Sequence, residues 1–154
     1  MTKETNSSKA PKTGMDLTTM PPRSPHTKIG GFMIIARTID KCRASLWGKL
    51  GEYHFDCPLD NQLFSFMDIK GDDFKAFVEK GHTDDEIAAW VKSEGIERSD
   101  DEIKDWNDTV SSNNYSAMPD KKPWLEGENV KLGLDKDATL FDMLDADDKA
   151  SFKK

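Results

Sequence analysis

Residues 30–58 read GGFMIIARTIDKCRASLWGKLGEYHFDCP and decide the fold that we predict for this chain. Apolar side chains recur in this stretch at the spacing of one helix face, at Ile35, Ile39, Cys42 and Leu46. A glycine pair precedes them and permits a tight turn. The pattern therefore predicts a central helix over residues 32–47, which is roughly 24 Å long.

The other side of this predicted helix is charged. Arg37 precedes Asp40 by three residues and Lys41 by four, so the face mixes one attraction with one repulsion. Two interpretations stay open. The face is either solvated, with one ion pair worth at most about 0.5 kcal/mol, or a partly buried charge cluster.

The composition bounds the size and class of the protein. A chain of 154 residues suits one domain with a core of its own. No run approaches 18 apolar residues, so we expect a soluble, cytoplasmic protein. A net charge of −7 argues against nucleic acid and anionic membranes as partners. We expect a disordered tail over residues 1–15 and a single helical domain over residues 16–152.

Short apolar runs alternate with turn residues along the rest of the chain. Three prolines in residues 15–28 favour an extended strap, anchored by Leu17 and Met20. Tyr53, Phe55 and Cys57 alternate with polar residues, as in a short strand or an extended segment. Further helices are predicted over residues 61–67, with Asp60 as the cap, and over residues 73–80 and 140–147.

Two near-copies, Thr83–Trp90 and Ser99–Trp106, begin sixteen residues apart. Each opens with a capping box, in which a hydroxyl and a glutamate three residues later satisfy backbone N–H groups. They predict helices over residues 84–94 and 100–111. Residues 73–94 also have the lengths of a helix-turn-helix, but the acidic second helix would repel phosphates, which excludes DNA as its target.

These elements together predict a mainly α fold. We expect a single-domain bundle of about six short helices with an extended Pro-rich N-terminal strap. Residues 111–136 are polar and irregular in pattern, so they predict a long loop before the last helix.

Three motifs resemble those of a known family: PPRSP at residues 21–25, IDKCRA at 39–44 and GEYHFDCPLD at 51–60. With them, residues 15–152 resemble a bacterial family of the DUF5069 type, to which no activity is assigned. The resemblance implies a fold shared along the whole chain and implies no reaction. His26 departs from the pattern, because an arginine is the more usual residue there.

The motifs and the local pattern together select seven candidate site residues: Arg23, Arg37, Asp40, Lys41, Arg43, His54 and Asp56. They converge if the strap and residues 51–58 both pack against the central helix. Arginine forks would then suit a carboxylate or phosphate, and His54 beside Asp40 or Asp56 would suit a base. In the alternative, the arginines tie the strap's carbonyls to the helix and Asp40 pairs with them.

Metal binding is a weaker interpretation. Cys42, His54 and Cys57 offer the nitrogen and sulfur ligands that zinc accepts, but the paired spacings of a zinc site are missing. We expect no metal and no cofactor. Two reduced cysteines are expected, with a bridge between residues 42 and 57 left open.

The function expected from these observations is binding or interaction without catalysis. The alternative is a small enzyme, or a protein that binds a small anion or metabolite through Arg37, Asp40, Lys41 and His54. The expected partner is a small anionic ligand or another protein, and the oligomeric state stays open. A pocket that joins Arg23, Arg37 and His54 would favour a ligand, whereas neutralised charges would favour an interaction module.

Overall fold

The computed structural model describes residues 14–112 and 121–152 of the chain. This part forms seven helices and no sheet, which confirms the mainly α prediction. The helices are α2 (Ile35–Leu46), α3 (Pro58–Met67), α4 (Gly71–Glu79), α5 (Asp84–Glu94), α6 (Asp100–Ser112), α7 (Lys122–Lys131) and α8 (Leu140–Ser151). The predicted disordered tail falls mainly on residues 1–13, outside the described residues.

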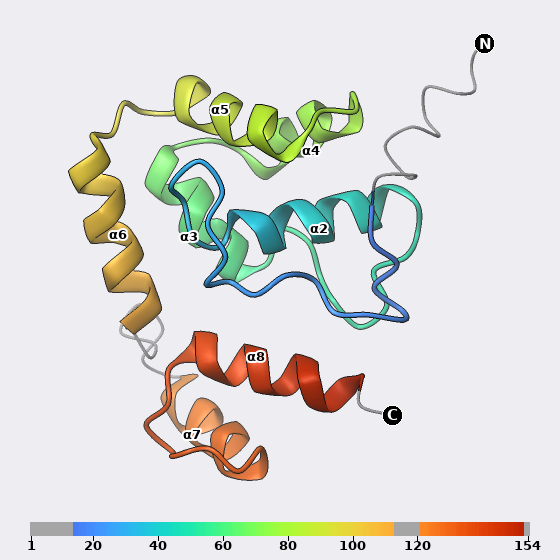
Figure 1. Cartoon of the computed structure of the whole chain (residues 1–154), viewed down its shortest axis with the longest axis vertical. Helices are drawn as coiled ribbons and strands as arrows, with labels where there is room; N and C mark the ends of the chain where they lie inside the picture. The colour runs from blue at the N-terminus through green and yellow to red at the C-terminus, as the bar shows by residue number, and fades with distance from the viewer. Residues whose placement is uncertain (1–13, 113–120, 153–154) are drawn as a thin grey trace.

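Helix α2 lies in the middle of the molecule (Figure 1). It contacts α3, α4 and α5, while α7 and α8 pack against each other on the opposite side of α2 from α4 and α5. In the two described ranges, each helix is too short or too polar to span a lipid bilayer.

Helix α2 starts three residues later than predicted because of the turn before it. Gly30 and Gly31 both have positive φ, and Ile29 and Phe32 exchange backbone hydrogen bonds across them. Ile34 also has a positive φ of 72°, so the α-helical conformation cannot begin before Ile35. Asn107 of α6 holds this turn, since its side chain accepts from Met33 N–H and donates to the Gly31 carbonyl.

The charged face of α2 is buried. Every residue from Ile35 to Ala44 is buried, including Arg37, Asp40 and Lys41. The solvated-face interpretation is therefore wrong, and the charge cluster lies inside the protein. The apolar stripe reaches the main core as predicted, with Ile35, Ile39 and Cys42 fully buried.

The strap holds at one of its two predicted anchors. Leu17 is buried, whereas Met20 is 42% exposed, contrary to the prediction. Residues 16–20 form a turn in which the Asp16 carbonyl accepts from Thr19 and Met20 N–H. The turn carries Met20 away from the core, so the segment is not extended there.

Helix α3 begins earlier than predicted, with Cys57 as its N-cap and Pro58 in its first turn. Asp60 is therefore not the cap. It lies three residues after the N-cap, and its carboxylate accepts from Asp56 and Cys57 N–H at 2.9 and 3.4 Å. Residues 51–57 contain a turn and a bend, with no strand among them.

The two capping boxes form as predicted. Thr83 and Glu86 cap α5, and Ser99 and Glu102 cap the start of α6. Both helices keep their predicted extents to within one residue.

The long loop predicted over residues 111–136 is wrong in part, because α7 occupies residues 122–131. Its pattern is weakly amphipathic: Leu125 is buried, but Trp124 and Val130 are 48% and 65% exposed. Leu125 packs with Met143 of α8 in a second, smaller core. The buried Asn129 also donates to the carbonyls of Lys136 and Ala138, so tertiary contacts hold this helix. Helix α8 starts at Leu140 as predicted, with Thr139 as its cap, and runs to Ser151, four residues beyond its predicted end.

Candidate functional site

Each charged side chain of α2 pairs with an opposite charge from a different segment. The pairs are Asp40 with Arg23 of the strap, Arg37 with Asp148 of α8, Lys41 with Asp60 of α3, and Arg43 with Asp84 of α5. The buried helix is therefore tied to four other segments by ion pairs.

Asp40 is the partner of the strap. Arg23 donates to its carboxylate from the backbone N–H at 2.8 Å and from Nε and Nη2 at 3.0 Å each. The spacing predicted a pair between Arg37 and Asp40, but Arg37 pairs with Asp148 instead. It reaches the strap only through a 3.4 Å hydrogen bond to the Arg23 carbonyl. Arg23 and Asp40 therefore attach the strap to the central helix, as in the alternative to a ligand site.

Asp84 at the start of α5 binds both Arg23 and Arg43. Arg23 Nη1 and Arg43 Nη1 donate to its two oxygens at 2.9 and 2.8 Å. Burial alone would raise the pKa of Asp84, but the two guanidinium groups hold this pKa below its usual value. The strap, α2 and α5 therefore meet at one ionised carboxylate.

Asp60 connects α2 to α3 at a point that is closed to solvent. Its carboxylate lies 3.1 Å from Lys41 Nζ and accepts from the Thr38 hydroxyl at 2.7 Å. Lys41 Nζ also donates to Cys57 Sγ at 3.1 Å. A lysine, a buried carboxylate and a thiol thus form one small cluster at the start of α3.

Asp148 connects α2 to α8. Arg37 Nη1 and the Tyr53 hydroxyl each donate to it at 2.7 Å. Burial and the hydrogen bond to this carboxylate raise the pKa of Tyr53, so the phenol stays protonated as the donor. The Arg37 guanidinium also lies 5.5 Å from the centre of the Tyr53 ring.

His54 and Asp56 lie apart from this network, and both are exposed. The Asp56 carboxylate accepts from Asn61 and lies over Gly71 at the start of α4. Within the described ranges, no hydrogen bond or ion pair joins His54 to Asp40 or Asp56, so the proposed base and its orienting carboxylate do not form. The ion pairs therefore include Arg23, Arg37, Asp40, Lys41 and Arg43, and leave His54 and Asp56 outside the network.

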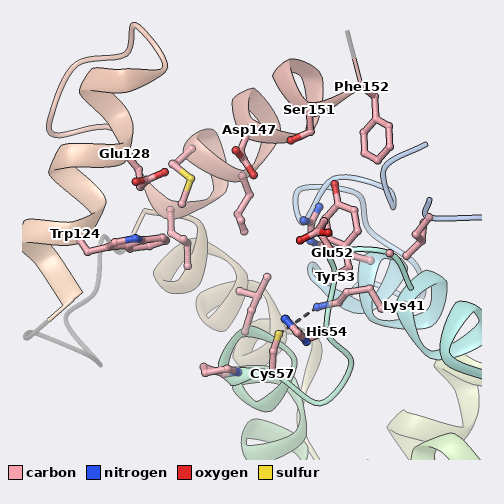
Figure 2. Close-up of a pocket in the computed structure, with 18 of the residues that line it drawn as sticks. Lys41, Glu52, Tyr53, His54, Cys57, Trp124, Glu128, Asp147, Ser151 and Phe152 are labelled. Carbon is pink, nitrogen blue, oxygen red and sulfur yellow. Dashed lines mark hydrogen bonds between the residues drawn. The ribbon is translucent and has the colours of Figure 1, made fainter. Parts of the chain in front are cut away.

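A pocket of about 860 Å³ opens between α7 and α8 on one side and residues 51–59 with the edge of α2 on the other (Figure 2). Its wall is mainly apolar, with contributions from α8, from Trp124 of α7 and from Leu59. Lys41, His54 and Cys57 line the end near α3. Glu52, Glu128 and Asp147 add carboxylates. Arg37 also reaches the pocket, whereas Arg23 does not line it.

The polar groups of this pocket differ in whether they are already paired. Arg37 and Lys41 are matched with Asp148 and Asp60. The Asp147 carboxylate has no hydrogen bond or ion pair to another described residue. Burial, followed by the nearby charges of Asp148 and Glu128, raises the pKa of Asp147. The pocket therefore offers an occupant an unpaired carboxylate, and Lys121 and His54 also line it.

Sequence reasoning missed most of the pocket. Tyr53 and Cys57 lie in the motif at residues 51–60, which was the available signal for them. Asp147 and Asp148 read as ordinary charges near a helix end, and Trp124 fell in the predicted loop. No pattern in the chain joins these residues, because the pocket forms only when α8 packs beside residues 51–59.

The cysteines are both free thiols, at positions 42 and 57. Cys42 is fully buried, and this burial raises its pKa to about 12. The structure places no three His, Cys, Asp or Glu side chains, among the residues it describes, where they could hold a metal ion together.

A family model matches residues 19–150, and its description is Domain of unknown function (DUF5069). The match confirms the resemblance inferred from the three motifs. No curated protein matches the chain.

Proposed function

The chain belongs to the DUF5069 family, and we propose that it is a binding protein that acts without catalysis. Its ligand is a small, largely apolar molecule that carries an amine or another hydrogen-bond donor, and it occupies the pocket between α8 and residues 51–59. The observation that carries the proposal is the pocket itself. Its volume of about 860 Å³ and its apolar wall are those of a small-molecule site.

The apolar part of the ligand would lie against the helices. Leu140, Met143 and Leu144 of α8 line the pocket together with Pro58, Leu59 and Trp124. Burying apolar surface stabilises a complex by about 25 cal/mol per Å², so this wall would supply most of the affinity.

The polar part of the ligand would meet carboxylates. Asp147 and Glu128 lie on the same rim of the pocket, above Trp124 (Figure 2). Glu128 pairs only with the exposed Lys131, and Asp147 pairs with no cation in the described part of the chain. Burial and the nearby charges of Asp148 and Glu128 raise the pKa of Asp147, and an ammonium group would offset both effects. The aromatic face of Trp124 offers a second favourable contact for a cation.

The anionic ligand expected from the sequence is disfavoured by the same contacts. An anion that replaced the carboxylate at Arg37 or at Lys41 would leave Asp148 or Asp60 buried without its partner. Breaking a buried ion pair in this way costs about 3–5 kcal/mol. A ligand that donates hydrogen bonds meets no such penalty.

The test is thermal unfolding of the full chain with three matched compounds: 2-phenylethylamine, 2-phenylethanol and 3-phenylpropanoate. We expect the amine to raise the melting temperature most and the carboxylate least. The amine's effect should shrink in Asp147→Asn and persist in Asp105→Asn, a variant of an exposed acid on α6. Equal shifts with all three compounds would contradict the proposed donor group, and no shift with any compound would contradict the site.

A further inference from the structure

We propose that Cys57 is a nucleophilic thiol that small unsaturated carbonyl compounds modify covalently from within the pocket. This inference goes beyond the proposed function, which needs no covalent step. It is carried by the contacts of the Cys57 sulfur, by the geometry of Lys41 and by the position of both residues on the pocket wall.

The Cys57 sulfur lies between two hydrogen-bond donors. Lys41 Nζ donates to Sγ at 3.1 Å, and the Cys57 side chain faces the Asp60 backbone N–H in the capping box that opens α3. Cys57 is the N-cap of this ten-residue helix, so Sγ also lies at the positive end of the helix dipole. A neighbouring ammonium and a helix N-terminus are the two features that activate cysteines as nucleophiles.

Lys41 is placed to assist the reaction as well as to hold the sulfur. Its side chain is only 4% exposed, yet it lines the pocket. An ammonium group has three N–H donors. Cys57 Sγ and the Asp60 carboxylate are its two partners among the described residues, which leaves one donor for an occupant of the pocket. That donor would stabilise the negative charge that develops on a carbonyl oxygen.

The addition of the thiol to the unsaturated carbonyl compound needs only water as a carrier of protons. The thiol first releases its proton to water, and the sulfur lone pair then forms a bond to the β-carbon of the unsaturated carbonyl. The carbon–carbon π pair moves toward the carbonyl oxygen as an enolate, beside the free N–H of Lys41. The α-carbon then takes a proton from water, so the net change is addition of S–H across the double bond.

Cys42 provides an internal comparison. It lies in the main core with no exposed surface, and burial raises its pKa to about 12. Only Cys57 among the two cysteines lines the pocket. The two thiols of one chain should therefore differ sharply in reactivity.

The experiment measures labelling by limiting N-ethylmaleimide, an unsaturated carbonyl probe, by mass spectrometry of the full-length protein at neutral pH. We expect one adduct per chain, mapped to Cys57, and none in Cys57→Ser under the same conditions. The rate should exceed that of Cys57 in the same chain unfolded in guanidinium chloride by about tenfold, because folding supplies the activating contacts. Cys42→Ala should keep the wild-type rate.

The contribution of Lys41 is tested by Lys41→Met, which should slow the labelling toward the rate of the unfolded chain. If this variant does not fold, the comparison of folded and unfolded wild type still decides the matter. Labelling of Cys42, or a folded rate no higher than the unfolded rate, would overturn the inference. Rapid labelling of Cys57 with no thermal response to any of the three matched compounds would sustain the inference and overturn the proposed function.

Discussion

Arg37 of α2 and Asp148 of α8 form a buried ion pair, with 2.7 Å between Nη1 and Oδ2, although 111 residues separate them in the sequence. Tyr53 donates to the same carboxylate. This single side chain therefore fixes α8 against both the central helix and the segment that lines the pocket.

Asp148→Asn should destabilise the protein by about 3 kcal/mol, because Arg37 would stay buried without a negative partner. Urea unfolding followed by circular dichroism measures this change. Asp105→Asn, on the exposed side of α6, should change the free energy of unfolding by less than about 0.5 kcal/mol. Similar values for the two variants would show that the ion pair contributes no more than a surface charge.

Asp84 should make the free energy of unfolding depend on pH in the acid range. Its pKa is lowered in the folded state, so the ionised carboxylate stabilises the fold above the usual aspartate pKa. This contribution is lost as the pH falls through the lowered pKa. Asp84→Asn should cost about 2 kcal/mol at neutral pH, and the difference from wild type should narrow in the acid range. Urea titrations across that range give the two curves, and a constant difference would contradict the assignment.

Two glycines should respond oppositely to alanine. A Cβ added to Gly95 would clash with the Met67 carbonyl oxygen, so Gly95→Ala should cost about 2–3 kcal/mol through overpacking. A Cβ at Gly127, inside α7, meets no atom of the described chain within 4 Å. Gly127→Ala should therefore stabilise the helix by about 0.5–1 kcal/mol. Melting temperatures of the two variants, compared with wild type, check both signs.

Binding of an amine should weaken in mild acid. The pKa of Asp147 is raised, so this carboxylate takes up a proton at a higher pH than an ordinary aspartate does. The ammonium ligand needs the ionised form, and its affinity should fall as the pH drops through that pKa. Calorimetric titration of 2-phenylethylamine at several pH values measures the change. In Asp147→Asn the affinity should be lower and should lose this pH dependence.

The parts of the fold that depend on local sequence were predicted best. The capping boxes at Thr83 and Ser99 use residues three apart, and the stripe of Ile35 and Ile39 lies within one helix, so neither needs tertiary information. Helix α7 was missed because its support comes from elsewhere. Asn129 and Leu125 hold it through contacts with residues 136–143, and its own pattern leaves Val130 exposed.

The candidate site was predicted in composition but not in connectivity. The motifs and the local pattern selected Arg37, Asp40, Lys41 and Arg43, which lie on α2, and Arg23 of the strap, which pairs with Asp40. The pairing of Asp40 with Arg23 was one of the two alternatives, but the partners of Arg37, Lys41 and Arg43 were not predicted, because no local pattern links them. The observed partners lie 17 to 111 residues away in sequence. Similarly, no local pattern links Asn107 to the Gly31 turn, which sets where α2 begins.

The pairing of Arg37 with Asp148 also has a consequence for how the chain is made. During synthesis on a ribosome, the segment of α2 emerges long before residue 148 has been translated. Until then, the Arg37 guanidinium has no carboxylate from α8, and a nascent chain that collapsed early would bury an uncompensated positive charge. The central helix must therefore stay hydrated, or be shielded by a chaperone, until its last ionic partner arrives.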